Sequence, residues 1–265
     1  MRIAWLYLRQ YLKVRLSYRW DFLAEFLAEL LGSAAGLAFL AGVFGGAGVA
    51  AIGDWPRDNV LFIYGFSMLS MGVFEMAAPA FWRFPETYLI EGRFDQVLLK
   101  PVSPLLQVLL TGFNPMGATE ILTGLALMTW ASCRLGLSWG PGSVLAAVVL
   151  GLSGGVILIS VFLALTCVSF WFEDRLGVQP PVYNCIVFGL YPIDVFHPAV
   201  RFLLRFVIPF AFIGYYPGGL FVEGGRWSEH TRMLAMATPL VAIACAVASG
   251  LLWRLGVSRY RSTGS

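Results

Sequence analysis

Two glutamates within long apolar stretches are the first residues whose chemistry needs an explanation. Glu75 and Glu120 each lie in a segment that could cross a membrane, where a carboxyl group is costly and marks a ligand or ion path by default. Methionine suits surfaces that accept varied apolar ligands, and two methionines share a helix face with Glu75. The spacing predicts a path for an amphipathic cation, lined by Met68, Met71, Glu75, Asn114 and Glu120. The alternative is that both glutamates are structural acids, neutral or paired near the end of a span.

The sequence lacks the spacing that common catalytic and nucleotide-binding motifs require. It contains no G-x-x-x-x-G-K-[ST], whose backbone N–H groups cradle the phosphates of ATP. Gly151 to Gly155 spell G-x-S-x-G, but the hydrolase motif needs a strand-to-helix turn, and these letters lie in an apolar stretch. His197 and His230 have no cysteine or aspartate spaced to join them, and the four cysteines lack metal-ligand spacing. We therefore expect no catalytic, cofactor or metal site in the chain, and an intramembrane enzyme stays an alternative.

Composition assigns the chain to a class before any element is placed. Its 265 residues are 58% hydrophobic and only 12% charged, whereas a typical soluble domain is about 25% charged. The mean hydropathy is +0.76. A soluble fold of this size leaves about a quarter of its unfolded surface exposed, so it could not hide this much apolar area. These values exclude an ordinary cytosolic enzyme, a disordered chain and a nucleic-acid binder. The apolar stretches are continuous, which favours helices over a transmembrane β-barrel.

The expected fold is an all-α polytopic membrane protein, with a single transmembrane domain over residues 1–265. Residues 1–20 combine a short apolar run with basic residues on one helix face, which is typical of an interfacial amphipathic helix. The alternative for them is the cytosolic end of the first span. About 20 apolar residues cross a hydrocarbon core of about 30 Å. Six transmembrane helices fit the remaining apolar density, near residues 22–46, 59–81, 106–131, 143–171, 178–193 and 234–256.

The stretch 194–222 does not read as a clean span. Pro198, Pro209 and Pro217 interrupt it, and each proline removes a backbone hydrogen-bond donor. Irregular backbone at membrane depth is stable only inside protein or against a water-filled cavity. The pattern predicts a pair of short extracellular re-entrant or interfacial helices before the last span, and a kinked seventh span is the alternative.

The distribution of basic residues predicts the orientation in the membrane. If the N-terminus is cytosolic, the cytosolic face collects twelve Lys and Arg residues and the opposite face collects six. Cytosolic loops carry an excess of Lys and Arg, so this two-to-one bias favours a topology with both termini in the cytosol.

One connection differs from the others in length and charge. Residues 83–107 separate the predicted second and third spans and mix charges of both signs with apolar residues. A half-apolar, mixed-charge helix between two spans is suited to docking a partner, so residues 83–104 are named the coupling segment here. The alternative is a helix lying on the membrane surface. The residues expected to make the partner contact are Glu86, Leu89, Glu91, Arg93, Phe94 and Asp95.

Residues 89–107, LIEGRFDQVLLKPVSPLLQ, resemble the loop of ABC-2-type permeases. The resemblance is to a branch in which a short Gly-(Leu/Phe)-Asp core precedes a (Lys/Arg)-Pro-Val-Ser-Pro ending. Three further stretches resemble the same branch, in the same order along the chain. They are FWFED at 170–174, YPIDVFHP at 191–198 and VIPFAFIGYYPGGLF at 207–221.

The resemblance implies a six-span half-transporter in a bacterial cytoplasmic (inner) membrane. It implies an exporter driven by a separate ATPase subunit that binds ATP and Mg. The residues of the predicted cation path, and not the resemblance, favour an amphipathic or hydrophobic substrate. The implied partners are two copies of this ATPase and a second permease, identical or related, within the lipid bilayer. The coupling segment would be the contact with the ATPase. A permease-like sensor or regulatory module that moves no substrate is the alternative, and the branch does not supply a substrate.

Overall fold

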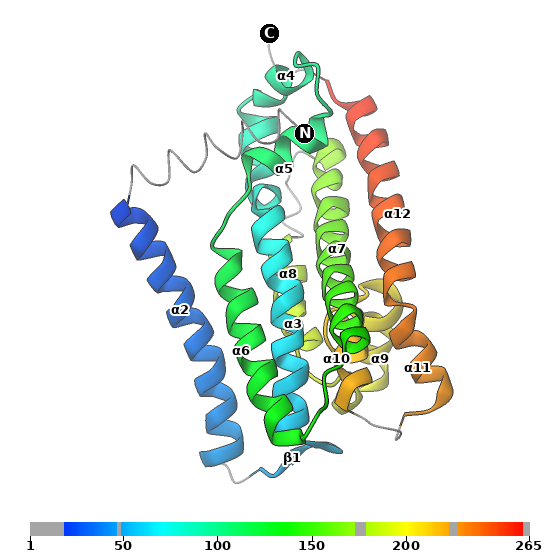
Figure 1. Cartoon of the computed structure of the whole chain (residues 1–265). Helices are drawn as coiled ribbons and strands as arrows, with labels where there is room; N and C mark the ends of the chain where they lie inside the picture. The colour runs from blue at the N-terminus through cyan, green and yellow to red at the C-terminus, as the bar shows by residue number, and fades with distance from the viewer. Residues whose placement is uncertain (1–18, 47–48, 173–178, 223–226, 262–265) are drawn as a thin grey trace.

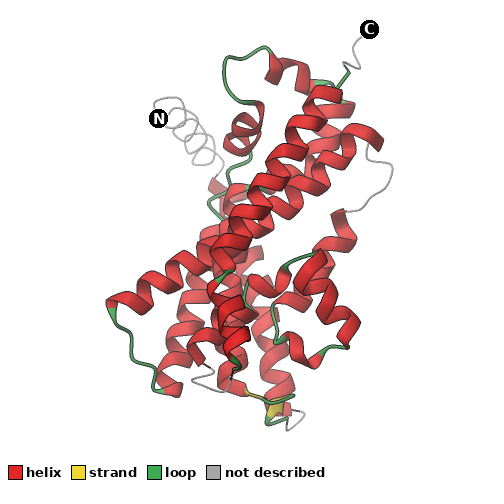
Figure 2. Ribbon diagram, turned by 90° about the vertical axis from the view of Figure 1, so that its right-hand side faces the viewer, coloured by secondary structure: helices red, strands yellow, loops and turns green. Residues whose placement is uncertain are grey.

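The computed structural model describes residues 19–46, 49–172, 179–222 and 227–261 as an elongated bundle of helices (Figure 1). Figure 2 shows the same body turned by 90°, with a short strand pair at one end. The strands β1 (Ala51–Ile52) and β2 (Trp55–Pro56) pair antiparallel. Nearly all of the interfacial helix expected at residues 1–20 falls outside the described residues.

The centre of the bundle is the antiparallel pair α3 (Arg57–Ala77) and α6 (Gly117–Leu135). A Cβ atom on Gly72 would lie 2.5 Å from the carbonyl oxygen of Gly117, and a Cβ on Gly117 would lie 2.5 Å from that of Gly72. One side chain at either position would therefore force the helices apart. Small residues at such crossings let two backbones touch, which is the main source of helix association in lipid.

The remaining long helices surround this pair. The 32-residue α7 (Pro141–Phe172) packs against α3 and against α12 (Thr238–Arg259). The first helix, α2 (Arg19–Ala41), continues as the single π-helical turn η1 (Gly42–Gly46). Only 6% of the most apolar stretch of α2 is buried, against 72% for α3. The α2 helix thus leaves most of its surface to lipid or to a partner.

Within the described residues, four helices are long and apolar enough to cross a membrane, and five if one bent pair counts as a span. The number and the bounds of the six predicted spans are therefore not confirmed. The predicted span 106–131 is divided into α5 (Pro104–Thr111) and α6 around the sequence GFNP, where Pro115 removes a backbone donor. The predicted span 178–193 contains α8 (Gln179–Gly189), whose 11 residues are too few to cross.

The bent pair coincides with the stretch that prolines interrupt. It joins α9 (Pro198–Phe202) and η5 (Leu203–Val207) to η6 (Phe210–Phe212) and α10 (Tyr215–Val222), with an angle of 77° between its halves. This geometry fits both alternatives from the sequence, a re-entrant loop and a broken span. The pair lies at the end of the bundle opposite α4, beside α11 (Glu229–Met236), while α2 begins and α12 ends toward the α4 end (Figure 1).

Candidate functional site

The coupling segment is built from short helical pieces at one end of the bundle. The 3-10 helix η2 (Pro79–Arg83) leads into it, and the π-helical η3 (Pro85–Ile90) follows. Both begin with proline, so α3 cannot continue straight. The chain then turns at Gly92, whose φ of 69° favours glycine, into α4 (Arg93–Leu98). The segment thus projects beyond the ends of α7 and α12 (Figure 1).

Aromatic rings hold the coupling segment to the bundle. Phe94 of α4 is fully buried, with its ring centroid 4.9 Å from that of Tyr260 and 5.6 Å from that of Phe170. Phe84 contacts Trp253 of α12 at 5.4 Å. These contacts are edge-to-face, the arrangement that aromatic rings favour. The group, named the coupling-segment cluster, consists of Phe84, Phe94, Phe170, Trp253 and Tyr260.

The predicted partner-contact residues divide between two faces. Leu89 and Phe94 are buried within the chain itself, so they anchor the segment instead of presenting an apolar contact to a partner. Glu86 is exposed, and so are Glu91 and Arg93, which form an ion pair of 2.9 Å on the surface. Exposed apolar contact area comes from Ile90 at 62%, Leu98 at 42% and Leu99 at 85% exposure, which lie outside the predicted set of six contact residues.

Asp95 lies between these two faces and is partly buried. It neighbours Tyr260, just beyond the last turn of α12. Burial, and then the proximity of the Asp95 carboxylate, raise the pKa of the Tyr260 phenol. Asp95 therefore links the surface of α4 to the end of α12.

Hydrogen bonds brace the segment from its other side. The Gln107 amide donates to the carbonyl oxygens of Val97, at 3.0 Å, and Val102, at 2.8 Å. The hydroxyls of Tyr88 and Thr111 share a hydrogen bond of 3.0 Å. All three bonds run to α5, which leads toward α6. A force on the coupling segment therefore reaches α5 through polar contacts and α7 and α12 through aromatic ones.

The residues of the predicted cation path lie along the α3–α6 pair. Met68 and Met71 are buried, and a Cβ on Gly124 of α6 would lie 3.0 Å from the Cβ of Met68. The Asn114 side chain accepts from the Met116 backbone N–H at 3.1 Å, so it shapes the turn before α6. Glu75 is half-buried, as is Glu120.

The structure brings the two glutamates together and adds a third. Glu75 and Glu120 are close enough to repel each other, and Glu29 of α2 repels both. One carboxyl oxygen of Glu120 is buried with no hydrogen-bond partner among the described residues. Asp21, Glu25 and Glu29 follow one another at four-residue spacing and so share one face of α2, but the sequence does not indicate that Glu29 meets the other two glutamates.

A second aromatic group lies at the opposite end of the bundle. Tyr215 of α10 contacts Trp55 at 5.7 Å and Trp227 at 5.5 Å, and its hydroxyl donates to the carboxylate of Asp194. Asp194 also pairs with the Arg205 guanidinium at 3.7 Å. We name this group the far-end cluster, and its members are Trp55, Asp194, Arg205, Tyr215, Tyr216 and Trp227.

Comparison with known proteins gives one result that covers most of the chain. Residues 33–264 match the family model described as ABC-2 family transporter protein. No curated protein and no solved structure matches the chain. The match confirms the resemblance seen at residues 89–107 and extends it on both sides. This chain therefore belongs to the ABC-2 transporter family and is a multi-pass membrane permease of an ABC transporter.

Proposed function

We propose that the chain is one permease half of an exporter for amphipathic or hydrophobic molecules. A separate ATPase subunit, present in two copies, binds ATP and Mg and docks on the coupling segment. A second permease, identical or related, completes the pathway, and the coupling segment and both termini face the cytosol of a bacterial inner membrane. Membership of a family whose members generally work with an ABC ATPase supports the separate subunit.

The observation that carries the docking proposal is the two-faced coupling segment. Its buried residues fix it to three helices, while charged residues and three large apolar side chains stay exposed. Because one face of the segment is packed on the bundle and the other is exposed, a partner could bind the exposed face and displace the segment without unfolding it. Nucleotide-driven movement requires the docked states to differ in contact energy at this surface.

Co-purification in mild detergent tests the docking, because it separates binding from folding. Ile90→Asp and Leu99→Asp place a charge in exposed apolar area, so we expect loss of the ATPase while the permease keeps its unfolding temperature. Glu229→Lys, an exposed charge reversal on α11 at the opposite end, is the control and should leave the complex intact. Full retention of the ATPase by both coupling-segment variants would place the contact elsewhere. Leu89→Asp is unsuitable, because burial of a charge there would disrupt the fold.

The cation path is a second part of the proposal, carried by the three carboxyl groups between α2, α3 and α6. Glu75→Gln and Glu120→Gln remove negative charge while keeping shape and hydrogen-bonding capacity. In vesicles that contain the complete transporter, both variants should lower ATP-driven movement of the organic cation ethidium. Transport of a neutral amphiphile should change little. Equal transport of ethidium by the variants and the natural protein would make both residues structural acids.

The sensor alternative predicts a different combination of results. A regulatory module would bind the ATPase through the same exposed surface but would drive no substrate movement in vesicles. Binding without flux, for a panel of cationic and neutral amphiphiles, would favour that alternative.

A further inference from the structure

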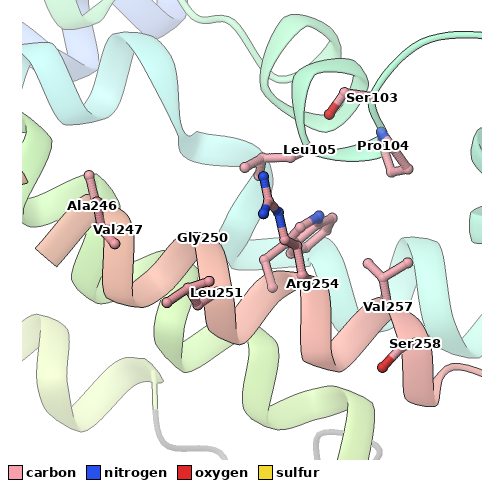
Figure 3. A pocket seen from close by; sticks show the side chains of 11 residues that line it. Ser103, Pro104, Leu105, Ala246, Val247, Gly250, Leu251, Arg254, Val257 and Ser258 are labelled. Atoms are coloured by element: carbon pink, nitrogen blue, oxygen red, sulfur yellow. The ribbon is translucent and has the colours of Figure 1, made fainter.

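A groove lies between the start of α5 and the second half of α12, on the other side of Trp253 from the rings of the coupling-segment cluster. Its volume is about 610 Å³, within the range of pockets that bind small molecules. The lining is apolar along Val247 and Leu251 and polar toward Ser103, Arg254 and Ser258 (Figure 3). The groove is therefore amphipathic along its length.

The dimensions of the groove match one leaflet of a bilayer. The α12 residues that line it run from Ala246 to Ser258. At 1.5 Å per residue this is about 18 Å of helix, slightly more than half of a hydrocarbon core of about 30 Å. Its polar end lies next to the last turn of α12, where the helix leaves the apolar region. An acyl chain placed along Val247 and Leu251 would bring its headgroup to Arg254.

Arg254 gives the polar end a positive charge. Its guanidinium extends from α12 across the groove toward Leu105 (Figure 3). No acidic side chain lines the groove, and Arg254 makes no ion pair with any described residue. Guanidinium binds phosphate oxygens with two parallel hydrogen bonds. The Ser103 hydroxyl caps no backbone N–H of α5, so it too can donate to a phosphate.

Charge decides between the occupants that could cover this groove. Residues 1–18 contain basic residues and no acid, so Arg254 would repel them. A second copy that packed symmetrically through this face would bring two Arg254 side chains together. A zwitterionic lipid carries a cationic group beside its phosphate. An anionic headgroup meets no such opposition, and basic pockets between helices near the cytosolic leaflet bind such headgroups in other membrane proteins.

We infer that the α5–α12 groove binds an anionic phospholipid, with the phosphate at Arg254 and an acyl chain along Val247 and Leu251. The site does not depend on the exporter proposal. It has a consequence for coupling, because Trp253 lines the groove and also belongs to the coupling-segment cluster. A bound lipid would join α5 to α12 next to the rings that hold α4.

Lipid-dependent unfolding of the purified full-length chain in detergent tests the site. We expect short-chain phosphatidylglycerol to raise the unfolding temperature more than phosphatidylcholine does. Arg254→Gln should weaken the apparent affinity for phosphatidylglycerol about tenfold, the effect of losing a charge-assisted hydrogen bond. Arg259→Gln, an exposed arginine of the same helix that does not line the groove, is the matched control and should bind normally.

Further variants keep the result interpretable if Arg254→Gln folds poorly. Arg254→Lys keeps the charge and should retain most of the affinity, while Leu251→Trp should fill the acyl end and reduce lipid binding measured by native mass spectrometry. Equal effects of Arg254→Gln and Arg259→Gln would overturn the site. If inorganic phosphate raised the unfolding temperature as much as phosphatidylglycerol does, the site would bind a free anion and not a lipid. A change of oligomeric state on Arg254→Gln would make the groove an interface between copies, which also contradicts the inference.

Discussion

The two ends of the bundle each hold an aromatic cluster, and the two clusters differ in chemistry. The coupling-segment cluster consists of rings alone and joins α4 to α7 and α12. The far-end cluster adds an ion pair and a tyrosine–aspartate hydrogen bond, and it joins the strand pair to the broken stretch before α12. Hydrogen bonds at the coupling end lie outside its cluster, between the segment and α5, whereas at the far end an ion pair and a hydrogen bond lie within the cluster itself.

This difference indicates how each end can move. Ring packing has no single geometry to satisfy, so the coupling-segment cluster can pass a displacement of α4 to two long helices while it stays packed. The polar contacts between Asp194, Arg205 and Tyr215 are satisfied in one arrangement, and each must break if α10 moves away. We interpret the first cluster as a transmitting joint and the second as a latch.

Removal of a central ring should have the largest effect. Phe94→Ala opens a cavity at a fully buried position, and comparable truncations cost about 3–5 kcal/mol of unfolding free energy. Thermal unfolding in detergent measures the loss. Phe202→Ala, an exposed ring at the opposite end, is the control and should change stability little. A near-normal stability of Phe94→Ala would mean that the cluster does not carry the segment.

Loss of charge in the far-end cluster should have an intermediate effect. Asp194→Asn removes the partner of Arg205 and weakens the acceptor of Tyr215, so we expect a loss of about 1–2 kcal/mol. About a third of each charged side chain is exposed, which limits the Coulomb contribution through solvent screening. A double-mutant cycle with Tyr215→Phe separates the hydrogen bond from the ion pair. A coupling energy of zero would contradict the latch.

Alkaline pH should have a smaller effect at the coupling end. The folded pKa of Tyr260 lies above its ordinary value of 10, so folding favours the protonated phenol. Its contribution is complete below pH 10 and is lost as the pH rises through the folded pKa. Unfolding temperatures of the natural protein and Tyr260→Phe should therefore converge above pH 10. Parallel curves across that range would exclude a contribution from Asp95.

The smallest effect is expected for the exposed ion pair on the coupling segment. Arg93→Ala removes a pair whose members are more than half exposed, and such pairs contribute about 0–1 kcal/mol. Stability should stay within about 0.5 kcal/mol of the natural protein, whereas affinity for the ATPase should fall. Destabilisation on the scale of Phe94→Ala would show that the outer face of α4 is structural.

The sequence allowed the coupling segment to be located but not oriented. Its charges and prolines predict an extramembrane connection, and in the structure it lies at one end of the bundle. Leu89 and Phe94 were expected at the partner contact and are buried instead. Helical periodicity assigns a face only along a regular helix, and here 3-10, π and α turns follow one another. The partners of Phe94 also lie far along the chain, so no local pattern identifies them.

The membrane-spanning helices were also predicted only in part from the sequence. Apolar density located α2, α3, α7 and α12 within a few residues. It merged α5 with α6, because a single turn of irregular backbone barely lowers the average hydropathy of the surrounding stretch. The cluster of Glu29, Glu75 and Glu120 depends on how α2 packs against α3 and α6, which hydropathy cannot indicate.

The close crossing of α3 and α6 also constrains how the protein enters the membrane during synthesis. The α6 helix has 19 residues but carries Glu120 and is not among the helices that are apolar enough to cross a membrane alone. Its partner α3 is apolar enough, is made first, and offers glycine surfaces against which α6 fits. We therefore expect the two helices to be released into lipid as a hairpin, in one step. A bulky residue at Gly72 would then cause α6 to fail to insert into the membrane during synthesis, before any folded transporter exists.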